Sequence, residues 1–160
     1  MTTNLFADVK LFATQGNSPT FNSDLEATLQ LCYDLVEEEV AKEFLPALMK
    51  YANSRSLENL TEAVDGAIDG IYVLIFFLSQ MGIDGQKMWD IVQKANMAKF
   101  VEGKFITNPL TGKVMKPPGW VAPDQAIHVE LIEWNSAQCG VEYKNGMVGK
   151  LSTTSETGEE

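Results

Sequence analysis

The sequence predicts an all-α protein: a helical bundle with a long ordered loop after its fourth helix and a flexible C-terminal tail. Apolar residues in the first half recur at intervals of three and four, the spacing of one face of an α-helix. Capping residues precede these stretches, and Gly or Pro follows them. The 160 residues, 45% hydrophobic and 21% charged, are typical of one globular domain.

The helices are expected, in chain order, at residues 3–14, 24–45, 56–81, 84–100 and 124–138. Asp24, Ser56 and Asp84 offer side-chain oxygens to the free amides of a first turn, and Gly82 ends the third helix. Pro46 is expected to kink the second helix, although its apolar pattern continues to residue 51.

Gly, Pro and Asn are too frequent between residues 102 and 123 for a regular element, so we expect one long ordered loop there. Loops of this length in compact domains are usually functional or disordered. The polar, acidic end of the chain, residues 150–160, is expected to be disordered. We therefore predict a domain over residues 1–140 and a C-terminal extension over residues 141–160.

Composition excludes several classes of protein. The net charge of −10 argues against a general nucleic-acid or membrane-surface binder. His128 is the one histidine, which leaves little for a zinc site or a Ser/His/Asp triad. Cys32 and Cys139 lack a metal-ligand spacing, so we expect free thiols in a reducing compartment. With no signal peptide evident and an apolar run at 71–82 too short for a membrane span, we predict a cytoplasmic protein.

The apolar seam of the second helix is expected to turn acidic. Its members step by three and four residues: Leu25, Leu29, Cys32, Val36, then Glu39 and Glu43. Glu38 borders this seam, and Glu37 is expected to point into solvent. The third helix carries an acidic stripe that becomes apolar: Glu62, Asp65, Asp69, Tyr72 and Phe76.

Carboxylates that converge in a partly buried place repel one another and lose hydration, at a penalty of several kcal/mol per uncompensated ion. Mg²⁺ or Mn²⁺ would compensate them, because these cations prefer oxygen ligands. A wet groove without any ligand explains the spacing equally well. Residues 91–120 hold five lysines and one acid, whereas residues 1–90 hold fourteen acids, a division that suits a metal-bound triphosphate. Any single lysine is also explained by the solubility of the loop.

Three segments carry a resemblance to a known family: EEEVAKEF (37–44), DGAIDGIYVLIFFLSQMGID (65–84) and VQKANMAKFVEGKFITNPLTGKVMKPPGWVAPD (92–124). Over residues 8–125 the chain resembles the MazG-like all-α nucleoside triphosphate pyrophosphohydrolases, whose relatives are phosphoribosyl-ATP pyrophosphohydrolases and dimeric dUTPases. The loop pattern of phage and bacterial members is matched by Asn96, Met97, Lys99, Gly112, Lys113, Lys116, Pro123 and Asp124.

The chain departs from the family pattern at a few positions. Three residues separate Glu39 from Glu43, and Gly66 stands three before Asp69, where Asp65 is the expected substitute. Gln93 and Ala95 stand at positions where histidine and serine are common in the family.

The resemblance implies hydrolysis of a nucleoside triphosphate to monophosphate and pyrophosphate by a homodimer or homotetramer. Two or three Mg²⁺ ions, or Mn²⁺, would be held by Glu39, Glu43, Asp65 and Asp69, with catalysis assigned to Glu38, Glu39, Glu43 and Asp69. The expected substrate-binding residues are Asn96, Lys99, Lys113, Lys116 and Trp120, although Trp120 is also explained as an anchor of its loop. A purine, dGTP first, is weakly favoured.

Other functions stay open. Within the same superfamily, dUTP or phosphoribosyl-ATP is the alternative substrate. In another class, a non-catalytic acidic protein that imitates DNA explains the charge, but it explains neither the acids on the seams nor the lysine-bearing loop. We expect neither polymeric nucleic acid nor a membrane as a partner.

Overall fold

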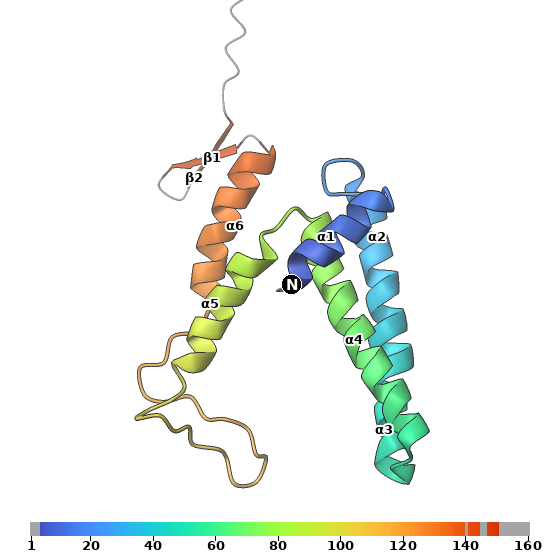
Figure 1. Ribbon diagram of the computed structural model, residues 1–160. Coiled ribbons are helices and arrows are strands. Elements are labelled where there is room, and N and C mark those ends of the chain that lie inside the picture. The colour runs from blue at the N-terminus through green and yellow to red at the C-terminus, as the bar shows by residue number, and fades with distance from the viewer. Residues whose placement is uncertain (1–3, 140, 145–146, 151–160) are drawn as a thin grey trace, which may run out of the picture. The chain divides into compact units, whose positions relative to one another are not determined.

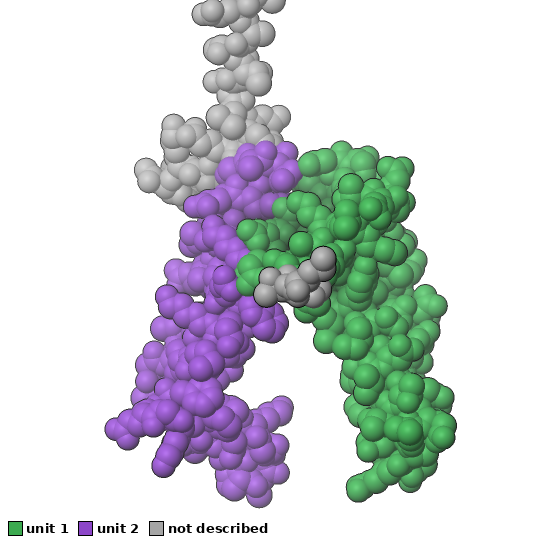
Figure 2. All heavy atoms as spheres, in the orientation of Figure 1, with its two compact units in different colours: residues 1–86 green, residues 87–160 purple. Residues whose placement is uncertain are grey.

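The computed structural model describes residues 4–139, 141–144 and 147–150, and its helices confirm the all-α class (Figure 1). The elements are α1 (Leu5–Gln15), α2 (Leu25–Val36), η1 (Glu37–Phe44), α3 (Leu45–Ser54), α4 (Leu57–Gln80), α5 (Gly85–Met97), α6 (Asp124–Cys139), β1 (Val141–Lys144) and β2 (Met147–Lys150). The chain divides into two compact units, Met1–Gln86 and Lys87–Glu160, and each is described by itself (Figure 2).

Two of the three predicted capping residues, Asp24 and Ser56, cap their helices. The Asp24 carboxylate accepts a hydrogen bond from the Ala27 N–H at 3.0 Å, and the Ser56 hydroxyl accepts one from the Asn59 N–H at 3.2 Å. Gly82 follows α4 in the left-handed conformation, with φ of 68°. The fourth predicted helix, α5, ends at Met97, three residues before its expected end.

In unit 1, the continuous helical run α2–η1–α3 packs antiparallel against α4, and α1 crosses α4 near its C-terminal end (Figure 1). The core cluster combines residues of three helices: Val9, Ala13, Cys32, Ile75 and Phe76. Two hydrogen bonds hold the connection between α1 and α2 against the end of α4. The Gln80 side-chain amide donates to the Pro19 carbonyl, and the Phe21 N–H donates to the Gln80 carbonyl at 2.9 Å.

The apolar seam predicted for the second helix is wrong in its first turns. Leu25 and Leu29 are exposed, whereas Thr28 and Cys32 are buried. The buried face of α2 therefore begins at Thr28, one residue away from the predicted position of Leu29. The Thr28 hydroxyl donates a hydrogen bond to the Asp24 carbonyl at 2.5 Å. Cys32 is a free thiol whose pKa is raised by burial, and the side chain of Cys139 lies outside the described part.

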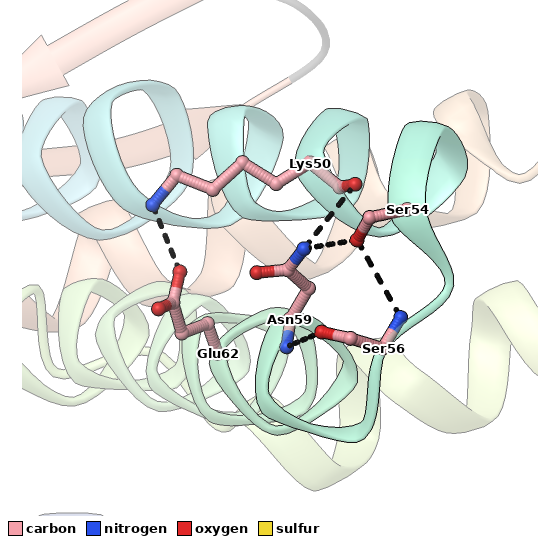
Figure 3. Close-up of polar contacts among 5 residues, drawn as sticks. All are labelled: Lys50, Ser54, Ser56, Asn59 and Glu62. Carbon is pink, nitrogen blue, oxygen red and sulfur yellow. Dashed lines mark hydrogen bonds and ion pairs between the residues drawn. The ribbon is translucent and has the colours of Figure 1, made fainter.

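Polar contacts close the turn between α3 and α4 (Figure 3). The Asn59 side-chain amide donates to the Ser54 hydroxyl and to the Lys50 carbonyl, the latter at 3.5 Å. One turn further along α4, Glu62 forms an ion pair with Lys50 at 2.9 Å. These contacts fix where α4 begins relative to α3.

In unit 2, the loop between α5 and α6 is ordered. Bridges pair Val101 with Lys104 and Thr107 with Val114, and the Phe100 and Phe105 rings meet edge to face at 4.9 Å. An ion pair between Lys87 and Glu130 joins α5 to α6.

The hairpin of β1 and β2 was not predicted. Its strands pair antiparallel, with Val141 opposite Lys150 and Lys144 opposite Met147. Of the predicted disordered tail, residues 150–160, Lys150 belongs instead to β2, and residues 151–160 lie outside the described residues.

No single helix in the described part of the chain is long and apolar enough to cross a membrane. Among the same described residues, α4 and α5 reach the required length and apolarity when they are counted together as a bent pair.

Candidate active site

The acidic segment EEEVAKEF forms a π-helix instead of the α-helix that its spacing predicts. Its hydrogen bonds span five residues, as where the Leu45 N–H donates to the Val40 carbonyl. Pro46 is the second residue after this segment, and in a regular α-helix its ring clashes with the carbonyl four residues earlier. A wider turn relieves that clash, so the helical run continues across the proline. Such π-segments occur frequently at functional sites.

Two glycines let α4 approach this π-helix closely. A Cβ atom on Gly66 would lie 3.0 Å from the Phe44 Cα and 3.1 Å from the Phe44 nitrogen. One turn later, a Cβ on Gly70 would lie 3.2 Å from the Val40 Cγ2. Each glycine directly follows an aspartate, so the close approach also brings Asp65 and Asp69 toward η1. Sequence reasoning missed the role of these glycines, although the Asp-Gly pair repeated four residues apart was a visible signal.

The carboxylates of η1 and α4 gather around Glu39, which is partly buried. The pKa of Glu39 is raised above its ordinary value, first by lost hydration and then by four neighbouring carboxylates: Glu43, Asp69, Glu38 and Asp65. We call these five residues the carboxylate cluster. They are the same five acids that the sequence and the resemblance singled out.

Two other acids of these helices are not members of the carboxylate cluster. Each of them forms an ion pair with a lysine. Glu37 pairs with Lys42 at 2.7 Å, across the five-residue spacing of the π-helix. The hydrogen bond from Lys42 to Glu37 is also the main cause of the raised pKa of Lys42. Glu62 pairs with Lys50 (Figure 3). The Glu37 side chain is 43% exposed, so it faces solvent only in part, and Glu43, which was predicted to lie on the buried seam, is exposed.

The donor chemistry of the carboxylate cluster fits a hard divalent cation, since every donor is a carboxylate oxygen and the charges repel one another. Among the residues that the structure describes, no three His, Cys, Asp or Glu side chains already surround one point. Binding an ion therefore requires side-chain rotation, for which exposed Glu38 and Glu43 have room.

A second group of predicted residues comes together in unit 2. The Nζ atoms of Lys99 and Lys116 lie 5.4 Å and 4.6 Å from the centroid of the Trp120 ring, within the range of a cation–π contact. Lys99 also donates to the Asn96 side-chain oxygen at 2.8 Å. We call these four residues the lysine–tryptophan cluster. Lys113 is exposed in the loop and is not part of it.

Trp120 also anchors its loop. The indole N–H donates to the Ala95 carbonyl at 2.7 Å, which fastens the proline-rich segment to α5. This contact supports the structural explanation of Trp120 that was left open above.

Comparison with known proteins identifies the family. The model of the phosphoribosyl-ATP pyrophosphohydrolase family matches residues 10–96, a range that contains the whole carboxylate cluster and more than half of the chain. No curated protein matches the chain. The family match agrees with the helical fold and with the resemblance to MazG-like enzymes. The chain therefore belongs to the phosphoribosyl-ATP pyrophosphohydrolase family of nucleotide pyrophosphohydrolases.

Proposed function

We propose that the protein hydrolyses a nucleoside or deoxynucleoside triphosphate to monophosphate and pyrophosphate, with Mg²⁺ or, as an alternative, Mn²⁺. One observation carries this proposal: the four carboxylates whose charges raise the pKa of Glu39 come from η1 and α4, within the range that matches the pyrophosphohydrolase family. Their mutual repulsion would favour binding of hard cations, which also bind phosphate oxygens.

In this proposal the ligands of two or three ions are Glu39, Glu43, Asp65 and Asp69. When bound, Mg²⁺ neutralises the charge that develops on the phosphate oxygens. A carboxylate oxygen of the cluster accepts the proton of the attacking water; the assigned catalytic residues are Glu38, Glu39, Glu43 and Asp69. Water attacks the α-phosphorus, so no covalent bond between enzyme and substrate is required.

The lysine-bearing segment is proposed to bind the substrate. Lys99 and Lys116 would neutralise phosphate, and their position beside one indole supports a shared role. Asn96 would bond sugar or phosphate. Lys113 is included from its place in the loop pattern alone, and stacking of a base on Trp120 stays a prediction.

For the base, dGTP is the first substrate to try, on the resemblance to phage members. Phosphoribosyl-ATP is the second candidate, because the matching family model describes a phosphoribosyl-ATP pyrophosphohydrolase. dUTP follows. Membership of an enzyme family argues against the non-catalytic DNA mimic, and a cytoplasmic location stays a prediction from the sequence.

We also propose a homodimer, or a tetramer built from dimers. Along α4 runs a row of apolar side chains that are between 36% and 74% exposed: Leu57, Leu60, Val64, Ile68, Ile71 and Leu74. They recur at helical spacing on a face other than the one that meets η1, so a second α4 can cover them. Exposed apolar surface of this extent is typical of an interface.

Product analysis tests the reaction. Each deoxynucleotide and ribonucleotide triphosphate, and phosphoribosyl-ATP, is incubated with the protein and either Mg²⁺ or Mn²⁺, and the products are separated by chromatography. We expect monophosphate and pyrophosphate in equal amounts. Release of orthophosphate with a nucleoside diphosphate would overturn the assigned chemistry. No turnover with either metal would favour the alternative of a non-catalytic acidic binding protein.

A further inference from the structure

A pocket of about 280 Å³ opens against the carboxylate cluster within unit 1. Its walls come from α1, α2, η1 and α4, and its principal lining residues are Phe12, Leu31, Leu35, Tyr72, Glu39 and Asp69. Two members of the carboxylate cluster therefore line an otherwise mainly apolar pocket.

The apolar end is built from aromatic rings. Phe12 and Tyr72 meet edge to face, with ring centroids 5.6 Å apart and planes at 85°. Phe76 lines the same pocket and is buried in the core, so this wall is backed by packed side chains. Phe12 itself is 59% exposed, which leaves much of its ring free to meet a flat ligand.

The size of the pocket limits its occupant. Sites that enclose a whole drug-sized ligand measure roughly 300–1,000 Å³. A pocket of about 280 Å³ is smaller and suits one ring system with part of a sugar. A nucleotide joins such a ring to phosphate through a single sugar, which matches an aromatic wall beside carboxylates that would hold metal-bound phosphate.

We propose that this pocket receives the nucleobase of the substrate and that Phe12 and Tyr72 form its contact surface. The inference rests on the proposed function and gives to α1 and α4 the stacking role that the sequence suggested for Trp120. Ser18 and Tyr72 also line the pocket, and each carries a hydroxyl group able to form a hydrogen bond with the edge of a base. These hydroxyls make the pocket the place where bases are distinguished.

The test compares two alanine variants of neighbouring side chains on α1 in the full chain. Phe12 lines the pocket, whereas Leu11 does not and is equally exposed, at 58%. Removing a stacking ring weakens base binding between about fivefold and a hundredfold. For Phe12→Ala we expect KM for dGTP to rise by such a factor, kcat to hold, and the ratios of kcat/KM among the four deoxynucleotides to approach one. Leu11→Ala should change KM by less than about twofold.

A second readout separates the pocket from the metal site. The increase in Tm produced by Mg²⁺ without nucleotide should be the same in Phe12→Ala as in the wild type, because no carboxylate has been changed. The inference would be overturned if Phe12→Ala kept the KM and base preference of the wild type. It would also be overturned if KM rose in Trp120→Ala but not in Phe12→Ala. Wild-type protein that turns over no nucleotide and gains no stability from Mg²⁺ would instead refute the proposed function, and the base pocket with it.

Discussion

Replacing Gly66 with alanine should separate the two helices that carry the carboxylate cluster. In an open helix this change stabilises by about 1 kcal/mol. Here the new Cβ would lie 3.0 Å from the Phe44 Cα, well inside the 3.5–4.0 Å optimum for two carbon atoms. Because the obstacle is backbone, no side-chain rotation relieves it, and α4 must move away from η1. Overpacking of this kind destabilises by about 1–3 kcal/mol.

The expected net loss is therefore up to about 2 kcal/mol, or roughly 4–8 °C in Tm for a chain of this size. Gly70→Ala is the matched control, because its Cβ would meet only the end of the Val40 side chain, at 3.2 Å, which can shift. Its stability should stay within about 1 kcal/mol of the wild type, since the gain in helix propensity offsets the tighter contact.

Thermal unfolding with and without Mg²⁺, and steady-state hydrolysis of dGTP, measure both effects. Gly66→Ala should lose most of its Mg²⁺-induced increase in Tm and most of its activity, whereas Gly70→Ala should retain both. If the two variants bind Mg²⁺ and turn over nucleotide equally well, close contact at Gly66 does not set the geometry of the site.

Glu39→Gln should lower kcat/KM by more than about a hundredfold, because even the outer partners of metal ligands are worth 10- to 100-fold. Glu37→Ala should stay within about threefold, since its carboxylate is paired with Lys42; equal losses would mean that the assigned helical phase is wrong. Without metal, the pKa of Glu39 in the folded protein lies above its ordinary value of 4.5, so ionisation of this carboxyl disfavours the folded state. The free energy of unfolding therefore falls as pH rises from 4.5 through the raised pKa of the folded protein. The Tm of Glu39→Gln minus that of the wild type should therefore increase with pH, and a constant difference in thermal unfolding would contradict this. Ile71→Glu should yield monomers in light scattering at micromolar concentration, whereas Leu110→Glu, in the exposed loop, should not; a wild-type monomer would refute the proposed assembly.

Helix boundaries were predictable because they depend on local chemistry. Asp24 and Ser56 cap the helices they were expected to cap, and Gly82 takes the left-handed conformation that ends α4. The end of α5 was placed three residues too far along because the residues after Met97 have no strong stop signal until Gly103.

The π-helix was not predictable from apolar spacing, because acids replace apolar residues over this stretch and leave no seam to reveal a changed period. The misplaced seam of α2 has a different cause. Leu25 and Leu29 are as apolar as core residues, and only the packing of α4 against the other face of α2 leaves them exposed.

The acids of the carboxylate cluster could be identified from the sequence because their spacing on each helix survives the change of helix type. What brings the two helices together could not, since it depends on the absence of a side chain at Gly66 and Gly70. The base pocket was missed for a related reason: Phe12 and Tyr72 are far apart in the chain and meet only through the crossing of α1 over α4.

Hydrolysis of dGTP in water enriched in heavy oxygen tests the central claim most directly. If the carboxylate cluster holds metal for attack on the α-phosphorus, mass spectrometry will find the heavy oxygen in the monophosphate and none in the pyrophosphate. The reaction should require Mg²⁺ or Mn²⁺ and disappear in Glu39→Gln. Label in the pyrophosphate, or in orthophosphate released beside a diphosphate, would contradict the account.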